Sequence, residues 1–318
     1  MAKKSGGDFA SLLQEYSTQR EFEMSDTGIE VFNELWGGGL VHGFMYGFYA
    51  TPGCGKTTLC LQLLRRRLKE GEKCCIVDIE KSINDFQLET FGLTEYRDNG
   101  QLIIVTMTMF NEYEKFMMAL ADNGEYTCVL VDSVSAIQPY IPKGTSVEDI
   151  RPGIRALQAS AVQSKIKSAF YNKGIVSLMI FQARANLDMS GNMYAPKEKS
   201  AAGFTERHLL DVETQLTTSS VIKDEDDRII GNKVWIECKK NKFCAPFQRR
   251  QSSLIFGKGI LKRIEVVDKA IELGIIQQRG SFFIVPGGED NIRGRKALYE
   301  LPAERLKAVQ QAIREANA

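Results

Sequence analysis

Histidine is scarce in this chain, and its cysteines lack the spacing of metal or disulfide frameworks. The 318 residues include two histidines, His42 and His208, which argues against a histidine-based metal site. No two of the seven cysteines form a C-x-x-C pair. We therefore interpret the adjacent Cys74 and Cys75, and the strand-like position Cys128, as small reduced core residues of a cytosolic protein.

The chain also lacks an excess of charge and a long hydrophobic run. Its 41 basic and 40 acidic residues leave a net charge of +1, so a nucleic-acid site must be a local patch or be built by assembly. No run of about 18 apolar residues occurs, so we expect no membrane span and a cytoplasmic location. The 43% of hydrophobic residues can form the core of one large domain with appendages, or of two domains.

What the chain does contain is a glycine-rich turn between an apolar strand, residues 44–49, and an amphipathic helix that begins at Lys56. Gly53 and Gly55 free the backbone to point its N–H groups at phosphate oxygens. Lys56 would reach the β- and γ-phosphates, and the Thr57 hydroxyl would help to hold Mg²⁺. A glycine-rich turn with a chance lysine is the alternative. The predicted ligands are ATP and Mg²⁺, and the predicted nucleotide-binding residues are Pro52, Gly53, Cys54, Gly55, Lys56, Thr57 and Thr58.

Further apolar runs alternate with helical intervals after this turn. They occupy residues 73–80, 102–105, 127–132 and 175–182. Such alternation predicts an α/β fold with a mostly parallel sheet covered on both faces, and ligands at the carboxyl ends of the strands.

Three of these runs end in polar residues that become candidates for chemistry. Asp132 is expected to hold Mg²⁺ directly or through water, or alternatively to cap a helix. Glu80 could orient the attacking water, or be an ordinary surface acid. Gln182 could bond a γ-phosphate or satisfy backbone groups.

Two polar stretches interrupt the alternation, residues 142–153 and 184–203. The second is long and has no periodicity, which is typical of a functional or an unstructured loop. Its cations could bind phosphates while an apolar and an aromatic residue pack against bases, as the binding of single-stranded DNA requires. An unstructured surface loop is the alternative. The residues concerned are Arg184, Met193, Tyr194, Lys197 and Lys199.

The two ends of the chain differ from its middle. Apolar residues at helical spacing over 8–16 predict an N-terminal helix that packs on its own core or on a neighbouring subunit, and 25–29 can cap a second helix. Beyond Leu216 the pattern predicts antiparallel strands at 219–223, 233–238 and 253–256. A basic run at 239–250 is either a solvated face or a phosphate clamp. A small module with helices at 264–273 and 303–316 and a strand at 282–285 follows a linker at 257–263.

With these residues laid out, the chain resembles the bacterial RecA family of DNA strand-exchange recombinases, in a shortened and diverged form such as phages carry. The resemblance spans roughly residues 25–285. Its most specific parts are Ser25-Asp26-Thr27-Gly28 leading to Gly38-Gly39-Leu40-Val41-His42-Gly43, and residues 240–247 leading to Ile255-Phe256-Gly257-Lys258-Gly259-Ile260. ATPases in general need neither part.

The resemblance implies a set of roles. Glu80 would be the catalytic glutamate, Asp132 the metal-side aspartate and Gln182 the γ-phosphate sensor. Residues 142–152, which include Arg151, would form the first DNA-binding loop and 184–203 the second. Lys240 and Lys242 would reach the ATP of a neighbouring subunit, and Phe256 would touch that nucleotide from the neighbour.

The resemblance also implies an organisation. We expect an N-terminal oligomerisation segment (1–35), a RecA-like P-loop ATPase core (36–260) and a small α+β C-terminal domain (261–318). Expected partners are single- and double-stranded DNA, further copies in a helical filament, and single-strand-binding and loader proteins. The expected function is ATP-dependent strand exchange. The alternatives are a RecA-core replicative helicase and an ATP-switched regulatory protein whose ATPase does not depend on DNA.

The chain departs from the family pattern in three places. The first glycine of the usual G-x-x-x-x-G-K-[ST] pattern is Ala50, which a negative φ tolerates. The aromatic residue expected to stack on adenine falls on Gln87, with Phe86 one position earlier. The chain stops at Ala318 without the acidic tail of many bacterial relatives, so we expect regulation through such a tail to be missing.

Overall fold

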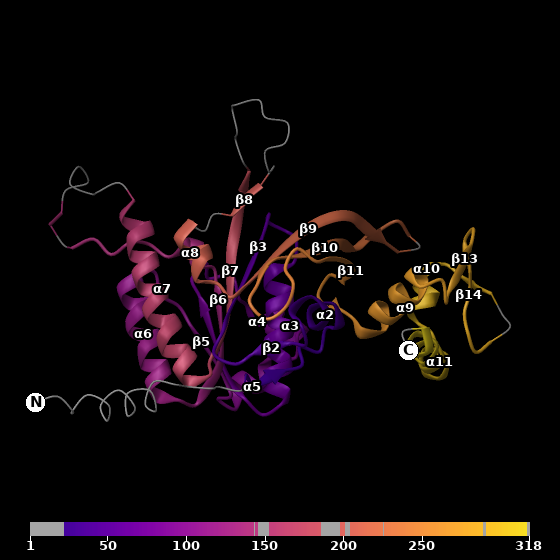
Figure 1. Ribbon diagram of the computed structural model, residues 1–318, viewed down its shortest axis with the longest axis horizontal. Coiled ribbons are helices and arrows are strands. Elements are labelled where there is room, and N and C mark those ends of the chain that lie inside the picture. The colour runs from indigo at the N-terminus through magenta and orange to yellow at the C-terminus, as the bar shows by residue number, and fades with distance from the viewer. Residues whose placement is uncertain are drawn as a thin grey trace, which may run out of the picture.

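The computed structural model describes residues 22–142, 144–145, 153–185, 198–200, 204–224, 226–288 and 291–316. In this part of the chain the central element is a sheet of ten strands in the order β12-β11-β10-β9-β3-β7-β6-β4-β5, with β8 paired to β7 (Figure 1). The predicted N-terminal helix at 8–16 lies outside the described residues.

The parallel half of the sheet confirms the predicted α/β class. Strands β3, β7, β6, β4 and β5 pair in parallel, and β9 pairs in parallel with β3. The side chains of β3, β4 and β6 are mostly buried because helices cover both faces of the sheet, which explains the continuous apolar runs. The bounds are Met45–Ala50 (β3), Lys73–Asp78 (β4), Leu102–Val105 (β5), Tyr126–Asp132 (β6) and Val176–Ala185 (β7).

Each face of the sheet has its own hydrophobic core. On one face α2 (Glu30–Trp36) and α3 (Lys56–Lys69) contribute Phe32, Trp36 and a series of leucines. On the other face, α6 (Phe110–Asn123) and α7 (Ile154–Lys173) contribute Tyr113, Ile166 and Phe170. Figure 1 shows α6 and α7 side by side, away from α2 and α3.

The antiparallel half of the sheet is longer than the sequence predicted. Strands β9 (Val212–Lys223) and β10 (Ile229–Asn241) form a long hairpin, and β11 (Arg249–Ile255) and β12 (Gly259–Ile260) follow at the edge. The basic run at 239–250 is therefore the end of β10, a turn and the start of β11. Short elements complete this part: β1 (Met24–Ser25), β2 (Leu40–Val41), α4 (Asp85–Thr90), α5 (Thr94–Asp98), a 3-10 turn (Val134–Ala136), β8 (Glu198–Ser200) and α8 (Phe204–Leu209).

A small α+β module ends the chain and has a core of its own, to which Val267, Phe283, Leu298 and Val309 belong. Figure 1 shows it beyond the antiparallel edge of the large sheet. The sequence predicted one strand here, whereas the described residues form three short ones. The elements are α9 (Lys262–Glu272), β13 (Gln277–Arg279), β14 (Phe282–Ile284), β15 (Ile292–Arg293), α10 (Arg295–Tyr299) and α11 (Ala303–Ala316).

One carboxylate joins this module to the start of the core. Helix α2 has Ile29 at its N-cap and therefore no capping side chain of its own. The two oxygens of Glu265, on α9, instead accept the backbone N–H groups of Glu30 and Val31 at 3.1 and 3.0 Å. Burial raises the pKa of Glu265 to about 7, against the opposing effect of these two hydrogen bonds.

Among the described residues, no helix combines the length with the apolarity that a membrane crossing requires.

Candidate active site

The glycine-rich turn lies where β3 ends and α3 begins. Gly53 and Gly55 adopt φ values of 81° and 85°, the left-handed region that favours glycine. At Gly55 a Cβ would also lie 2.4 Å from Cδ1 of Leu254, so a side chain there would have to displace the Leu254 side chain of β11. Ala50 ends β3 and is not among the described residues with positive φ, so the alanine fits the turn.

The side chain of Lys56 is hydrogen-bonded back to the backbone of the turn that precedes it. Its Nζ donates to the carbonyl oxygens of Ala50 and Thr51 at 2.9 and 3.1 Å. Burial lowers the pKa of the ammonium, although nearby acids, Asp132 among them, oppose the shift. The Lys56 ammonium is therefore hydrogen-bonded to two uncharged carbonyl oxygens. An incoming phosphate could replace these carbonyls as its partner.

Thr57 and Asp132 meet across two elements. The Thr57 hydroxyl donates to Oδ2 of Asp132 at 2.7 Å. Burial raises the pKa of this carboxyl to about 6, while the hydrogen bond from Thr57 works in the opposite direction. A hydroxyl and a carboxylate at the mouth of a phosphate loop are oxygen ligands of the kind that Mg²⁺ prefers, so the residues present fit this ion. The alternative that Asp132 is a helix N-cap is wrong, because the turn that follows has Ser133 at its N-cap.

Glu80 is held by two side chains, one just after the end of β6 and one within β7. Its Oε1 accepts a hydrogen bond from the hydroxyl of Ser133 and another, of 2.8 Å, from Nε2 of Gln182. Asp78, at the end of β4, accepts the N–H groups of Ser82 and Ile83 and so fixes the turn that carries Glu80. The Gln182 side chain thus donates to this acid rather than to a backbone carbonyl.

A cavity of about 270 Å³ adjoins the glycine-rich turn, and Phe256 lines it together with Gly53, Gly55, Lys56, Thr57, Thr58, Leu254 and Gly257. The resemblance assigned Phe256 to the nucleotide of a neighbour, but the structure places this half-exposed ring beside the phosphate loop of its own chain. Helix α4 closes the same region, since Thr90 lies against Gly257. Gln87 is engaged in the capping box of α4, whereas Phe86 is exposed.

Lys240 and Lys242, the lysines assigned to a neighbouring ATP, are not among the residues that line this cavity. Lys240 donates to the carbonyl oxygens of Arg207 and His208 at 3.3 and 2.8 Å. Lys242 Nζ lies 2.7 Å from Oδ1 of Asp211. Within one chain, therefore, both lysines have partners, and neither is near Lys56 in the contacts described.

Comparison with known proteins places this arrangement in a family. The family model described as the RecA N-terminal domain matches residues 3–261. This chain belongs to the RecA family. Protein RecA of Bartonella quintana (strain Toulouse) is 27% identical over 246 residues, which cover 77% of this chain and 69% of the relative. Protein RecA of Chlorobium limicola is 29% identical over 246 residues (77% and 68%), and that of Methylobacterium sp. (strain 4-46) 26% over 262 residues (81% and 70%). These findings support a RecA-like recombinase.

The residues predicted to contact DNA are only partly within the described chain. Arg151, Met193, Tyr194 and Lys197 lie outside it. Arg184 and Lys199 were expected in a loop without regular structure, but they lie in β7 and β8, where their backbones pair. Figure 1 shows this ribbon projecting from the sheet. Since β7 also carries Gln182, one strand connects the Glu80 contact to the base of the second predicted DNA loop.

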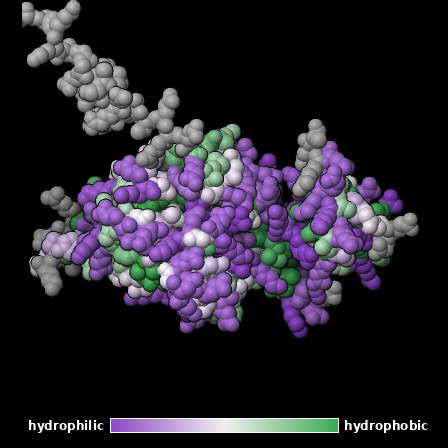
Figure 2. Space-filling model, turned by 90° about the horizontal axis from the view of Figure 1, so that it is seen from below, coloured by the Kyte–Doolittle hydropathy of each residue, from purple (hydrophilic) through white to green (hydrophobic). Residues whose placement is uncertain are grey.

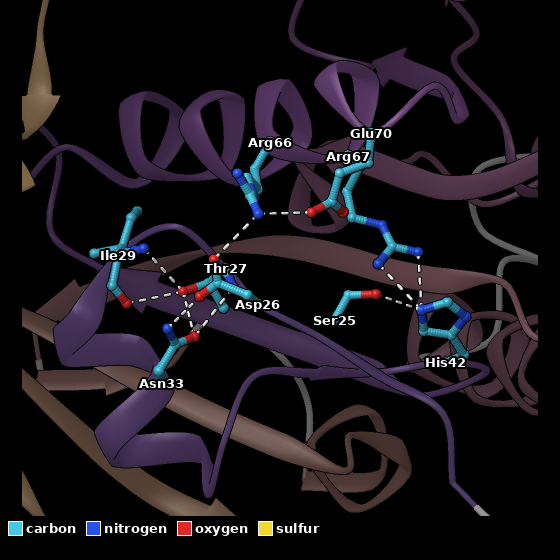
Figure 3. A network of polar contacts seen from close by, with 9 residues as sticks. All are labelled: Ser25, Asp26, Thr27, Ile29, Asn33, His42, Arg66, Arg67 and Glu70. Atoms are coloured by element: carbon cyan, nitrogen blue, oxygen red, sulfur yellow. Dashed lines mark hydrogen bonds and ion pairs between the residues drawn. The ribbon is translucent and has the colours of Figure 1, made fainter.

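The RecA-specific motif near the start of the chain is anchored on the far end of α3 (Figure 3). His42 Nε2 lies 2.8 Å from the Ser25 hydroxyl and 3.1 Å from both terminal nitrogens of Arg67. Arg67 is completely buried and forms an ion pair of 2.7 Å with Glu72. Burial and the charge of Arg67 lower the pKa of His42. This network holds the segment before α2 against the helix whose other end follows the glycine-rich turn.

The second RecA-specific motif also contacts α3. The side chain of Gln62 accepts the N–H of Ile260 at 3.0 Å and donates to the carbonyl of the same residue at 2.6 Å. At Gly259 a Cβ would lie 2.2 Å from Oε1 of Gln62, so the motif needs a glycine there. Sequence reasoning missed Gln62, because a polar residue on an amphipathic helix resembles a solvent-facing one.

Sequence reasoning also missed Ser133 and Asp211, although the sequence contains an indication of each. Ser133 directly follows Asp132 and reaches the other acid of the site, Glu80. Asp211 lies between the buried Leu210 and Val212, and a charged residue inside an apolar run is a sign of a buried ion pair.

Proposed function

We propose that this chain is an ATP-dependent recombinase that forms filaments on single-stranded DNA and catalyses pairing and strand exchange with duplex DNA. The observation that carries the proposal is the Gln182 to Glu80 hydrogen bond of 2.8 Å. It joins the candidate catalytic carboxylate to the strand that continues to Arg184 and the second DNA loop. An ATPase acting without DNA has no need of this connection.

The chain's own residues suggest how ATP would be used. Lys56 would leave the carbonyls of Ala50 and Thr51 for the β- and γ-phosphates, and the N–H groups of the turn would surround the phosphate oxygens. Thr57 and Asp132 would hold Mg²⁺, which when bound neutralises charge on the phosphates. Glu80, fixed by Ser133 and Gln182, would orient the attacking water. Loss of the γ-phosphate would then change what Gln182 contacts.

Assembly would complete the site. In this proposal Lys240 and Lys242 of one protomer neutralise the ATP of the next, so nucleotide binding stabilises the form in which both DNA loops are aligned. A net charge of +1 is consistent with DNA affinity that comes from many aligned weak sites rather than one basic face. On the face drawn in Figure 2, hydrophilic residues cover most of the surface and hydrophobic areas are scattered among them.

We further propose the organisation that accompanies this function. Residues 1–35 serve oligomerisation, 36–260 form the ATPase core and 261–318 the C-terminal domain. Single-strand-binding and loader proteins are proposed as partners in the bacterial cytoplasm, where a phage-infected cell is one setting.

ATP hydrolysis with and without single-stranded DNA tests the proposal, with Lys56→Ala as the inactive control. We expect the DNA to stimulate hydrolysis, and we expect a joint-molecule assay with homologous duplex to give paired products. Hydrolysis that ignores DNA would favour the ATP-switched regulator. Unwinding of duplex without pairing would favour the helicase.

A further inference from the structure

A buried carboxylate, Asp211, holds one of the two lysines assigned to the neighbouring ATP. Asp211 precedes β9, and its side chain is completely inaccessible to solvent. Its Oδ1 lies 2.7 Å from Nζ of Lys242 and 2.6 Å from Nζ of Lys167 on α7. Its Oδ2 accepts the backbone N–H of Met45 at 3.0 Å. Two cations therefore share one oxygen of a single buried anion.

The two lysines are not equivalent. The side chain of Lys167 is 23% exposed and also donates to the carbonyl of Leu209, whereas that of Lys242 is 48% exposed. Removing one partner of an isolated buried ion pair is costly, because it leaves a charge without compensation. If Lys242 leaves, however, Asp211 keeps Lys167 and the Met45 N–H. The group becomes electrically neutral instead of carrying one excess positive charge.

The backbone of the surrounding turn is fixed by Asn241 and not by the two lysines. Oδ1 of Asn241 accepts the N–H groups of Phe243 and Cys244 at 2.7 and 3.2 Å, and its Nδ2 donates to the carbonyl of Leu35 at 3.2 Å. Lys240 is held by carbonyl oxygens alone. Its pKa is lowered by burial and then by the charge of Lys242, so the two ammonium groups repel each other.

We propose that Asp211 is a positioning residue that holds Lys242 within its own chain until the ATP of a neighbouring protomer draws the lysine away, and that Lys167 is the second cation that makes this release easy. The inference rests on the proposed function, in which Lys242 reaches across the interface. Its consequence is that the strength of the Asp211 contact sets the ATP concentration at which protomers assemble.

The experiment measures that concentration directly. Full-length variants are titrated with ATP and Mg²⁺ in the presence of single-stranded DNA, and assembly is followed by light scattering. Asp211→Asn keeps an oxygen for Met45 but loses the charge that holds Lys242, so we expect the midpoint to fall about fivefold, as for one partly exposed ion pair. Lys167→Gln leaves Lys242 as the sole cation on Asp211, so we expect the midpoint to rise by a similar factor.

Matched control variants distinguish this effect from a general loss of folding stability. Lys165 lies on the same helix as Lys167 and pairs with Glu114 at 2.6 Å, so Lys165→Gln should leave the midpoint unchanged. In a Lys242→Ala background neither Asp211→Asn nor Lys167→Gln should shift it. Should Asp211→Asn fail to fold, as shown by its melting curve, the rise with Lys167→Gln and its loss in the Lys242→Ala background decide the question.

The outcomes also distinguish this inference from the proposed function. If Lys242→Ala alone leaves ATP-dependent assembly intact, the lysine does not act across the interface and the proposed function loses that step. If Lys242→Ala weakens assembly but the Asp211 and Lys167 variants shift the midpoint in the same direction, or not at all, only the positioning role is overturned.

Discussion

The side-chain amide of Gln182 donates a hydrogen bond of 2.8 Å to Oε1 of Glu80, although 102 residues separate the two in sequence. They meet because β7, β6 and β4 are neighbours in the sheet, and Gln182 lies level with Ala50, the last residue of β3, on the side of the sheet where β4 and β6 also end. A ligand that binds beside Glu80 would therefore change a direct contact of the Gln182 side chain.

We expect Gln182→Ala to uncouple hydrolysis from DNA. The basal ATPase rate should fall, because Glu80 loses one of the two side chains that fix it, and the stimulation by single-stranded DNA relative to that basal rate should fall about tenfold, a typical coupling between two sites. The measurement is the hydrolysis rate at saturating ATP over a series of DNA concentrations. Gln138, whose amide reaches only the carbonyl of Ala136 at 3.3 Å, provides the control variant Gln138→Ala. Equal stimulation in both variants would contradict the coupling.

Asp132 should make the nucleotide-free protein less stable as the pH rises. Its pKa is about 6 when folded and near 3.8 otherwise, so between these values the folded state binds more protons. Stability therefore falls as pH rises through this window, by up to about 3 kcal/mol. We expect Asp132→Asn to raise the free energy of unfolding at pH 7.5 but not at pH 4, and to abolish Mg²⁺-dependent hydrolysis.

Urea unfolding at the two pH values, without nucleotide or Mg²⁺, provides the measurement. The exposed Asp122 on α6 is the matched control, because Asp122→Asn removes a charge that is not buried. A gain in stability for Asp132→Asn that is the same at both pH values would show that burial of the charge is not its cause.

Gln62→Leu should loosen the connection between α3, which follows the glycine-rich turn, and the motif beside Phe256. Two backbone groups of Ile260 lose their partner, which costs about 1–3 kcal/mol for each group that stays buried. We expect weaker binding of a fluorescent ATP analogue and faster proteolysis within residues 257–262. Gln158 makes the same two-bond contact with the backbone of Tyr140, far from the cavity, so Gln158→Leu should leave nucleotide affinity unchanged.

Arg67→Leu should destabilise the whole core. The change leaves Glu72 without its buried partner, and breaking such a pair costs about 3–5 kcal/mol. Arg66, one residue earlier, pairs with Asp26 and Glu70 at a 39% exposed position, so Arg66→Leu should cost less than about 1 kcal/mol. Chemical denaturation of both variants compares the two costs, and similar values would argue against a special role for the buried arginine.

The elements that sequence reasoning predicted well are those with a strong apolar signal. The helix beginning at Lys56 and the strand at 102–105 have the predicted bounds, and the other parallel strands differ at their ends by a few residues. Helix α7 was missed, although it has 20 residues, because its buried face alternates Ala159, Val162 and Phe170 with small and polar residues. Weak contrast between its faces leaves little periodicity to detect.

For the site, the positions of Lys56, Thr57 and Asp132 could be anticipated from the rule that parallel strands present their carboxyl ends together. Contacts that depend on the order of strands could not. Glu80 meets Gln182, and Asp211 meets Lys167 and Lys242, only once β3 lies between β7 and β9 and β6 lies between β4 and β7. Phe256 shows the limit of assigning roles by position in a resemblance. The resemblance predicts an aromatic ring at a nucleotide, but it does not determine which protomer's nucleotide the ring contacts.

The Glu265 cap on α2 has a practical consequence for dissecting the molecule. A shortened polypeptide that stopped at Ile260 would keep every strand of the large sheet and still lose the acceptor for the first amides of α2. Phe32 and Trp36, which α2 itself contributes to the core, would then lie on a helix whose first turn is frayed. The C-terminal module therefore stabilises the first turn of α2, and a capping Ser or Asp at position 29 would not replace it without cost, because Ile29 is completely buried in the core.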